Sequence, residues 1–124
     1  MKNISFLLIA IFLLNFLLSC KKKDTENHLP VIMFKTGDQY TKDGAVVKVG
    51  YKLLFGIQAR GTDDNITNFT IKKVLEDGTV ITVMDTGLNS ISMDIDKLLY
   101  QNIESKVVWK FTVMDRQRRT ADIS

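Results

Sequence analysis

Residues 51–60 read YKLLFGIQAR, and apolar and polar side chains alternate along most of this segment. In a β-strand, Leu53, Phe55, Ile57 and Ala59 point to one side and the residues between them to the other. Strict alternation of this kind predicts a strand with one buried face. Past residue 29, no window of about 12 residues has a convincing helical period.

The same period of two recurs through residues 91–96 and 107–113, and turn residues punctuate the chain between the alternating runs. The turn signals are Thr36-Gly37-Asp38, Lys42-Asp43-Gly44, Gly61-Thr62-Asp63-Asp64-Asn65, Asp77-Gly78 and Thr86-Gly87. We expect strands near residues 31–35, 45–49, 51–60, 66–75, 79–85, 91–96, 106–114 and 119–124, with one helical turn over 96–100. Short strands at this spacing, without helices, predict an all-β sandwich of two antiparallel sheets.

Asp77-Gly78 suits a two-residue type I′ hairpin, because both positions of that turn need a positive φ. Counting back from it pairs Leu75 with Val80, Val74 with Ile81, and Ile71 with Met84. The two faces of this hairpin then conflict, since Phe69, Ile71 and Leu75 point one way and Val74, Ile81 and Val83 the other. A bulge in either strand would resolve the conflict, at a position that the pattern does not give.

The alternating faces also predict which side chains fill the core and how the last strand pairs. We expect six buried residues: Phe55, Ile57, Ile95, Trp109, Phe111 and Val113. Residues 119–124 alternate and follow a hairpin loop, so they should pair antiparallel with 106–114 as a short edge strand. Because the alternation stops mid-pattern, we expect either a fragment of a longer protein or a domain that a partner strand completes.

The N-terminal segment has the zones of an export signal. Lys2 precedes an apolar run from Ile4 to Leu18, interrupted by Ser5 and Asn15, and small and basic residues follow. The run is shorter than the roughly 20 apolar residues of a stable membrane span. We interpret residues 1–19 as a removable signal peptide.

Cys20 is the only cysteine of the chain, so no disulfide can form within it. The sequence Leu17-Leu18-Ser19-Cys20 resembles the lipobox of bacterial lipoproteins, with a mild departure at Leu18. The resemblance implies a diacylglyceryl thioether on Cys20 and cleavage before it, and two or more acyl chains anchor a protein stably. A plain signal peptide or signal anchor with an incidental cysteine is the alternative.

Three further segments resemble the immunoglobulin-like domain of small Bacteroidetes lipoproteins, over nearly all of residues 30–124. They are residues 30–34 (PVIMF), 47–59 (VKVGYKLLFGIQA) and 109–115 (WKFTVMD). Residues 20–29 are polar and form a tether. Residue 21 is Lys rather than the Asp that retains some lipoproteins in the inner membrane, so the resemblance implies anchoring in the outer membrane. Both the periplasmic and the surface side of that membrane are compatible with it.

Composition excludes some partners. The net charge of +3 falls to +2 once Lys2 leaves with the signal, and the basic residues are dispersed. Nucleic acid is therefore not an expected partner. We expect no cofactor.

Few residues suggest chemistry. Asp85-Thr86-Gly87 matches the aspartic-protease signature, but no later glycine supplies that family's supporting motif. The oxygen ligands of Asp38, Asp63, Asp64 and Asn65 lack the spacing of an EF-hand, and His28, in the tether, has no second histidine for zinc. We therefore expect neither a catalytic site nor a metal site.

The expected function is a lipid-anchored, non-enzymatic binding or spacer module of the cell envelope. The alternative is an accessory lipoprotein subunit of an outer-membrane uptake or assembly complex. Candidate ligand contacts are Arg116, Arg118 and Arg119, which cluster near a hairpin tip and would suit an acidic envelope protein or a glycan. Trp109 is expected in the core, with carbohydrate stacking as the alternative, which Tyr40, Tyr51 and Tyr100 share.

Overall fold

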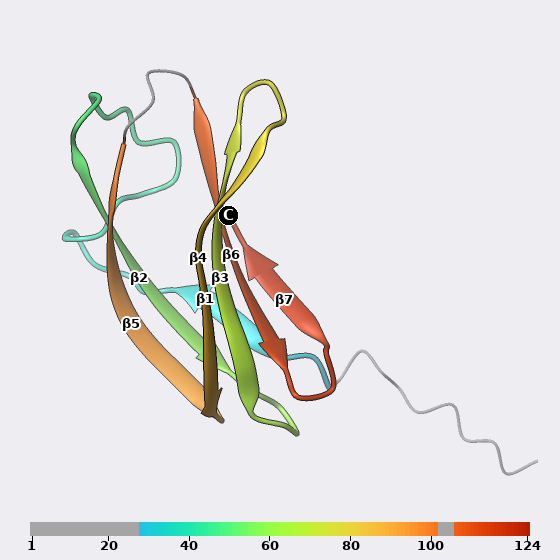
Figure 1. Ribbon diagram of the computed structural model, residues 1–124. Helices are drawn as coiled ribbons and strands as arrows, with labels where there is room; N and C mark the ends of the chain where they lie inside the picture. The colour runs from blue at the N-terminus through green and yellow to red at the C-terminus, as the bar shows by residue number, and fades with distance from the viewer. Residues whose placement is uncertain (1–27, 102–105) are drawn as a thin grey trace, which may run out of the picture.

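The computed structural model describes residues 28–101 and 106–124, which form seven β-strands and no α-helix (Figure 1). The predicted all-β class is confirmed. The strands are β1 (Val31–Phe34), β2 (Lys52–Arg60), β3 (Ile66–Leu75), β4 (Val80–Ser90), β5 (Ser92–Tyr100), β6 (Val107–Asp115) and β7 (Thr120–Ile123).

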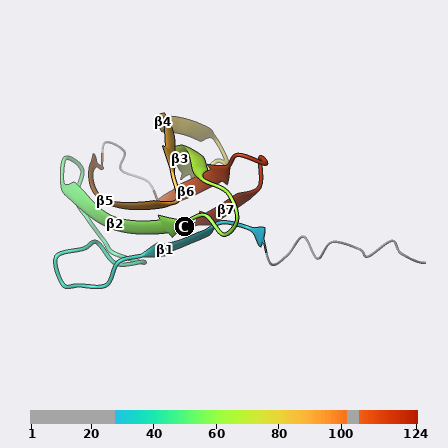
Figure 2. The same ribbon diagram turned by 90° about the horizontal axis from the view of Figure 1, so that it is seen from below.

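The strands form two antiparallel sheets that pack face to face. One sheet has the order β1-β2-β5 and the other β4-β3-β6-β7. Seen from below, β1 and β2 lie on one side of the molecule and β3 and β4 on the other (Figure 2). This arrangement confirms the predicted sandwich of two antiparallel sheets.

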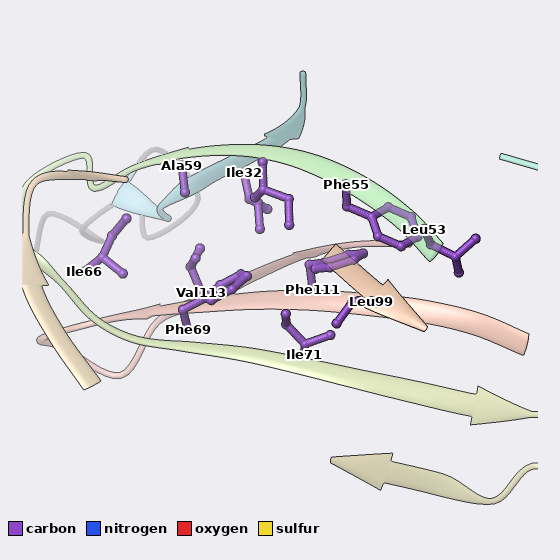
Figure 3. Packing of buried hydrophobic residues seen from close by; sticks show 11 residues of the cluster. Ile32, Leu53, Phe55, Ala59, Ile66, Phe69, Ile71, Leu99, Phe111 and Val113 are labelled. Atoms are coloured by element: carbon purple, nitrogen blue, oxygen red, sulfur yellow. The ribbon is translucent and has the colours of Figure 1, made fainter. Parts of the chain in front are cut away.

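The core lies between the two layers and is built by the alternation that the sequence shows. Its side chains project from both sheets towards one another (Figure 3). Four of the six predicted core residues are buried, namely Phe55, Ile57, Phe111 and Val113. The other two, Ile95 and Trp109, are half-buried and pack against this cluster. Ile32, Leu53, Ala59, Ile66, Phe69, Ile71 and Leu99 complete it.

The β3–β4 hairpin differs from the predicted two-residue turn. The amide of Leu75 donates to the carbonyl of Thr79 (2.9 Å), and the amide of Gly78 donates to the carbonyl of Leu75 (3.0 Å). The loop therefore has three residues, with Gly78 at a φ of 85° in the left-handed position that such loops require. Asp77-Gly78 is compatible with a two-residue and with a three-residue loop, so the residue types did not distinguish the two loop lengths.

The longer loop shifts the register of this hairpin. Val74 pairs with Val80, so the predicted pairs of Leu75 with Val80 and of Val74 with Ile81 are wrong. The predicted pair of Ile71 with Met84 is right, because Val83 is an extra residue that restores the alignment. Val83 is therefore the bulge that was predicted from the sequence in one of these two strands.

Three expected elements have other limits. Residues 45–49 form no strand. The helical turn expected over residues 96–100 is wrong, because β5 continues to Tyr100 and places Leu99 opposite Leu53 in the core. β4 continues past residue 85 to Ser90. By contrast, the last strand is confirmed, since β7 pairs antiparallel with β6 at one edge of its sheet.

Candidate binding cavity

A cavity of about 820 Å³ lies between the segment that follows β1 and one side of the sandwich. Its apolar wall comes from the ends of three strands, and its rim from polar residues of the 35–47 segment. The wall includes Phe34, Leu53, Phe55, Val107 and Trp109. Its size is within the range of small-molecule sites, which are commonly apolar with a few convergent polar groups.

Unequal strand lengths create this cavity. β1 pairs only with residues 57–60 of β2, although β2 begins at Lys52. β7 pairs only with residues 111–114 of β6, although β6 begins at Val107. The side of the sandwich beyond these pairs is covered by the 35–47 segment. Two carbonyls on the free edge of β2 accept from that segment, Gly56 from the amide of Lys35 and Leu54 from the amide of Thr41, both at 2.8 Å.

Three aromatic residues, Phe34, Phe55 and Trp109, line the cavity and pack against one another or against Phe111. The ring centroids of Phe55 and Trp109 are 6.2 Å apart, and those of Phe55 and Phe111 are 5.0 Å apart. Phe34 meets Phe111 edge-on at 5.7 Å. Such tilted and edge-on contacts are the favoured geometries of aromatic pairs. Trp109 is half-buried because the cavity leaves part of its indole open.

A polar cluster on the outer face of β2 and β5 fastens the covering segment. The ammonium of Lys35 lies 2.7 Å from a carboxylate oxygen of both Asp94 and Asp96. The hydroxyl of Tyr40 donates to Asp96 (3.0 Å), and the amide of Gln58 donates to Asp94 (2.9 Å). The covering segment is thus tied to the sheet by the side chains of Lys35 and Tyr40, and also by Thr41, whose hydroxyl accepts from the amide of Leu54 (3.0 Å).

Gly56 makes the close approach of this segment to the sheet feasible. A Cβ at residue 56 would lie 2.6 Å from ring carbons of Tyr40 and 2.8 Å from the Cβ of Lys35. Real Cβ atoms do not come so close, so any larger residue would push Tyr40 away. Glycine in the interior of a strand often marks this kind of approach.

The ion pairs shift the titration of their members. Hydrogen bonds from Lys35, and then from Gln58, hold the pKa of Asp94 below its ordinary value. Hydrogen bonds from Lys35 and then Tyr40 lower the pKa of Asp96 in the same way. The hydrogen bonds to Asp94 and Asp96 raise the pKa of Lys35 above its ordinary value. All three groups are therefore held in their charged forms at neutral pH.

The three candidate arginines lie at the other end of β6, away from the cavity. Arg119 binds within the domain, with its guanidinium 2.7 Å from the carboxylate of Asp115 and 3.0 Å from that of Asp64. Asp115 is buried and also accepts from the amides of Gln117 and Arg119. Arg116 and Arg118 are exposed. The structure thus holds Arg119 in internal ion pairs, whereas the exposed Arg116 donates to the side-chain oxygen of Asn89 (3.4 Å).

The remaining candidates are dispersed. His28 contacts Asp63, and the hydroxyl of Thr62 donates to the carbonyl of Leu29, so the end of the predicted tether lies against the 61–65 loop. Asp85, Thr86 and Gly87 lie exposed within β4. Within residues 28–101 and 106–124, no group of three acidic, histidine or cysteine side chains could hold a metal ion.

The predicted lipid-attachment residue Cys20 and the predicted lipobox residues Leu17, Leu18 and Ser19 lie outside the described residues. In the part of the chain that the structure describes, no helix is long and apolar enough to span a membrane.

The sequence interpretation missed the cluster around Lys35. One available signal was the pair Asp94 and Asp96, which alternate with Met93 and Ile95 and so share the outer face of one strand. Nothing in the sequence placed Lys35 and Tyr40 beside them, because those residues come more than 50 positions earlier. No family model, curated protein or solved structure matches this chain.

Proposed function

We propose that the protein is a lipid-anchored, non-enzymatic binding module of the cell envelope that takes its ligand in the cavity beside Trp109. The observation that carries this proposal is the cavity itself, with aromatic residues in its lining and a polar rim. Binding residues on loops held by a rigid scaffold are a common arrangement. Here the scaffold is the sandwich, and the Lys35 cluster holds the loop segment.

The chemistry of the lining favours a sugar. A pyranose ring has apolar C–H faces, which stack on aromatic side chains, and hydroxyls around its edge. The cavity offers Trp109 for the first contact, and Tyr40 lines its rim. It offers the polar side chains of Lys42 and Lys106 for the second. We therefore propose an envelope glycan as the ligand, with Arg116 and Arg118 as a separate surface for acidic groups.

The fluorescence of Trp109 provides the test, because it is the only tryptophan of the chain and it lines the cavity. The full-length protein is screened on a glycan array, and bound oligosaccharides are titrated while the indole emission is followed. We expect saturable shifts that Tyr40→Ala weakens. The matched control is Tyr51→Ala, at an exposed tyrosine that does not line the cavity.

Two results would contradict the glycan proposal. One is an array without binding. The other is binding that leaves the Trp109 emission unchanged and that Arg116→Ala and Arg118→Ala abolish, which would move the site to the β6–β7 hairpin.

A second candidate function is that of an accessory subunit of an envelope uptake or assembly complex. Four exposed apolar side chains near the end of β5 favour it, namely Val49, Tyr51, Leu98 and Tyr100. Residues 49–51 reach this place because the amide of Gly50 and the carbonyl of Tyr51 both bind the backbone of Gln101. Tyrosines are enriched at protein interfaces. A pull-down from solubilised membranes tests this role, and Leu98→Lys should abolish stoichiometric recovery of a membrane partner.

A further inference from the structure

β4 is an edge strand whose outer side has no partner among the described residues. It ends the order β4-β3-β6-β7 and is 11 residues long. Unpaired backbone amides and carbonyls along such an edge are a template for another strand. The β4 edge is therefore a surface on which backbone hydrogen bonds are available.

Comparison with β5, an edge strand of the other sheet, shows that β4 carries fewer of the charges that usually protect an edge. β5 carries Asp94, Asp96 and Lys97, whereas Asp85 is the only charged residue of β4. Residues 79–84 contain no charge, glycine or proline. Val80, Ile81 and Val83 are 56%, 36% and 41% exposed. Charged residues and prolines are the devices that normally discourage edge pairing.

The bulge at Val83 restricts which strand can pair with this edge. Thr82 lies opposite Lys72 and Asp85 opposite Thr70, so both belong to the outer face although three positions separate them. A regular strand would stay in register on only one side of the bulge. A second copy of β4, related by a two-fold axis, carries the same extra residue. Residues 80–87 of one copy can then pair antiparallel with residues 80–87 of the other, and paired residues belong to the same face of the sheet.

Charge selects one register of this pairing. On the outer face, Thr82 lies opposite Lys72 and Asp85 lies opposite Thr70, whereas Lys110 and Asp122 further along the sheet pair with each other at 3.2 Å. If Thr82 lies opposite Asp85 of the second copy, the carboxylate of Asp85 in each copy continues the row that holds Lys72 of the other. The neighbouring register, with Val80 opposite Asp85, sets the carboxylate beside apolar Val80 and Val74.

We propose that two copies of this chain associate through β4, antiparallel over residues 80–87, with Thr82 opposite Asp85. The paired sheets then form one continuous sheet across the two-fold axis. An interface along one strand edge is smaller than that of a stable dimer, so the association is weak and depends on concentration.

Disulfide trapping with the full-length chain tests the register. Two differently tagged copies are co-expressed, one with Thr82→Cys and one with Asp85→Cys, and then oxidised mildly. A disulfide needs Cα atoms within about 7 Å, so we expect at least about tenfold more mixed-tag dimer than for Val80→Cys with Asp85→Cys. The unsubstituted chain controls for Cys20. Equal trapping in both pairs, or none, overturns the proposal.

Charge reversal tests the interface without a covalent bond. The mass of the full-length chain in detergent is followed by sedimentation over a range of concentrations. We expect Asp85→Lys to shift the dimer to the monomer, and Lys72→Glu in the same chain to restore the dimer. Asp43→Lys, the same change at another exposed aspartate, should leave it intact. A monomer at every concentration, an open-ended polymer, or a different protein bound along β4 would each overturn the two-fold dimer.

Discussion

Arg118 has a φ of 63°, a left-handed conformation that costs an L-residue about 1 to 2 kcal/mol. It occupies in the β6–β7 hairpin the position that Gly78 occupies in the β3–β4 hairpin. In both loops the left-handed residue donates to the carbonyl three positions earlier, at 3.0 Å. The carboxylate of Asp115 holds the arginine loop closed by accepting from the amides of Gln117 and Arg119.

Arg118→Gly should therefore raise the free energy of unfolding by about 1 kcal/mol, because glycine adopts this conformation without strain. Urea denaturation of the two proteins measures the change. Arg116→Gly is the matched control, since Arg116 has no positive φ, and it should give no gain. Equal effects of the two substitutions would contradict the strain argument.

At the scale of elements, the 35–47 segment has no strand or helix of its own, and the Lys35 cluster joins it to β5. The ion pairs of Lys35 with Asp94 and Asp96 lie on the sheet surface, so their effect on global stability is modest. Their main consequence is local, since they hold Tyr40 against Gly56 at the rim of the cavity.

Acid should release this segment before the sandwich unfolds. The pKa values of Asp94 and Asp96 are lowered in the folded protein, so their contribution is complete above the ordinary value of 3.8 and is lost as the pH falls below it. The pKa of Lys35 is raised, so its contribution is complete below 10.5 and is lost at higher pH. The segment should thus be anchored between these limits.

Trp109 emission against pH, compared with the far-ultraviolet circular dichroism of the strands, measures this release. We expect the emission to change below pH 3.8 while the strand signal persists. Asp94→Asn with Asp96→Asn should remove that early step, whereas Asp43→Asn should not. Coincident transitions in both signals would show that the segment and the sandwich unfold together.

At the scale of the whole molecule, Phe111 and Trp109 of β6 differ in burial, although both side chains contact Phe55. Phe111 is fully buried and packs against Phe34 and Phe55, whereas Trp109 is half-buried at the cavity. The sequence alone suggested that Trp109→Ala would cost about 3 to 5 kcal/mol, the cost of deleting a large buried aromatic. In the structure it is Phe111, not Trp109, that is the fully buried aromatic residue of β6, so this cost is expected at Phe111.

Phe111→Ala should therefore destabilise the domain by about 3 to 5 kcal/mol, and Trp109→Ala by roughly half as much. A domain of this size has about 5 to 15 kcal/mol in total, so the first variant approaches unfolding. Urea midpoints of both variants provide the measurement. A larger loss for Trp109→Ala would mean that the cavity is closed in solution.

The location of the whole molecule is a separate prediction that depends on Cys20. Cys20→Ala should block lipid attachment, so the precursor would stay uncut or be released as soluble protein. Metabolic labelling with a palmitate analogue reads this directly, with Ser92→Ala as a control at a distant exposed position. Label that persists in the Cys20 variant would contradict the lipobox interpretation.

The sequence by itself determined the class of fold and part of the core. Residues 52–60 and 107–115 alternate with a period of two, and this local pattern specifies which face of each strand is buried whatever its neighbours are. The same locality explains why the turn near Gly78 and the last hairpin were anticipated.

Only the tertiary structure decided the register, the cavity and the exposed edge. The bulge at Val83 is defined by how β4 pairs with β3. Residues 96–100 form a strand because Leu99 lies opposite Leu53. The cavity arises because β1 and β7 cover less than the full length of β2 and β6, and it is closed by contacts from Lys35 to residues about 60 positions away. The physical reason is that burial pattern is a property of each segment, whereas pairing lengths and long-range ion pairs belong to two segments at once.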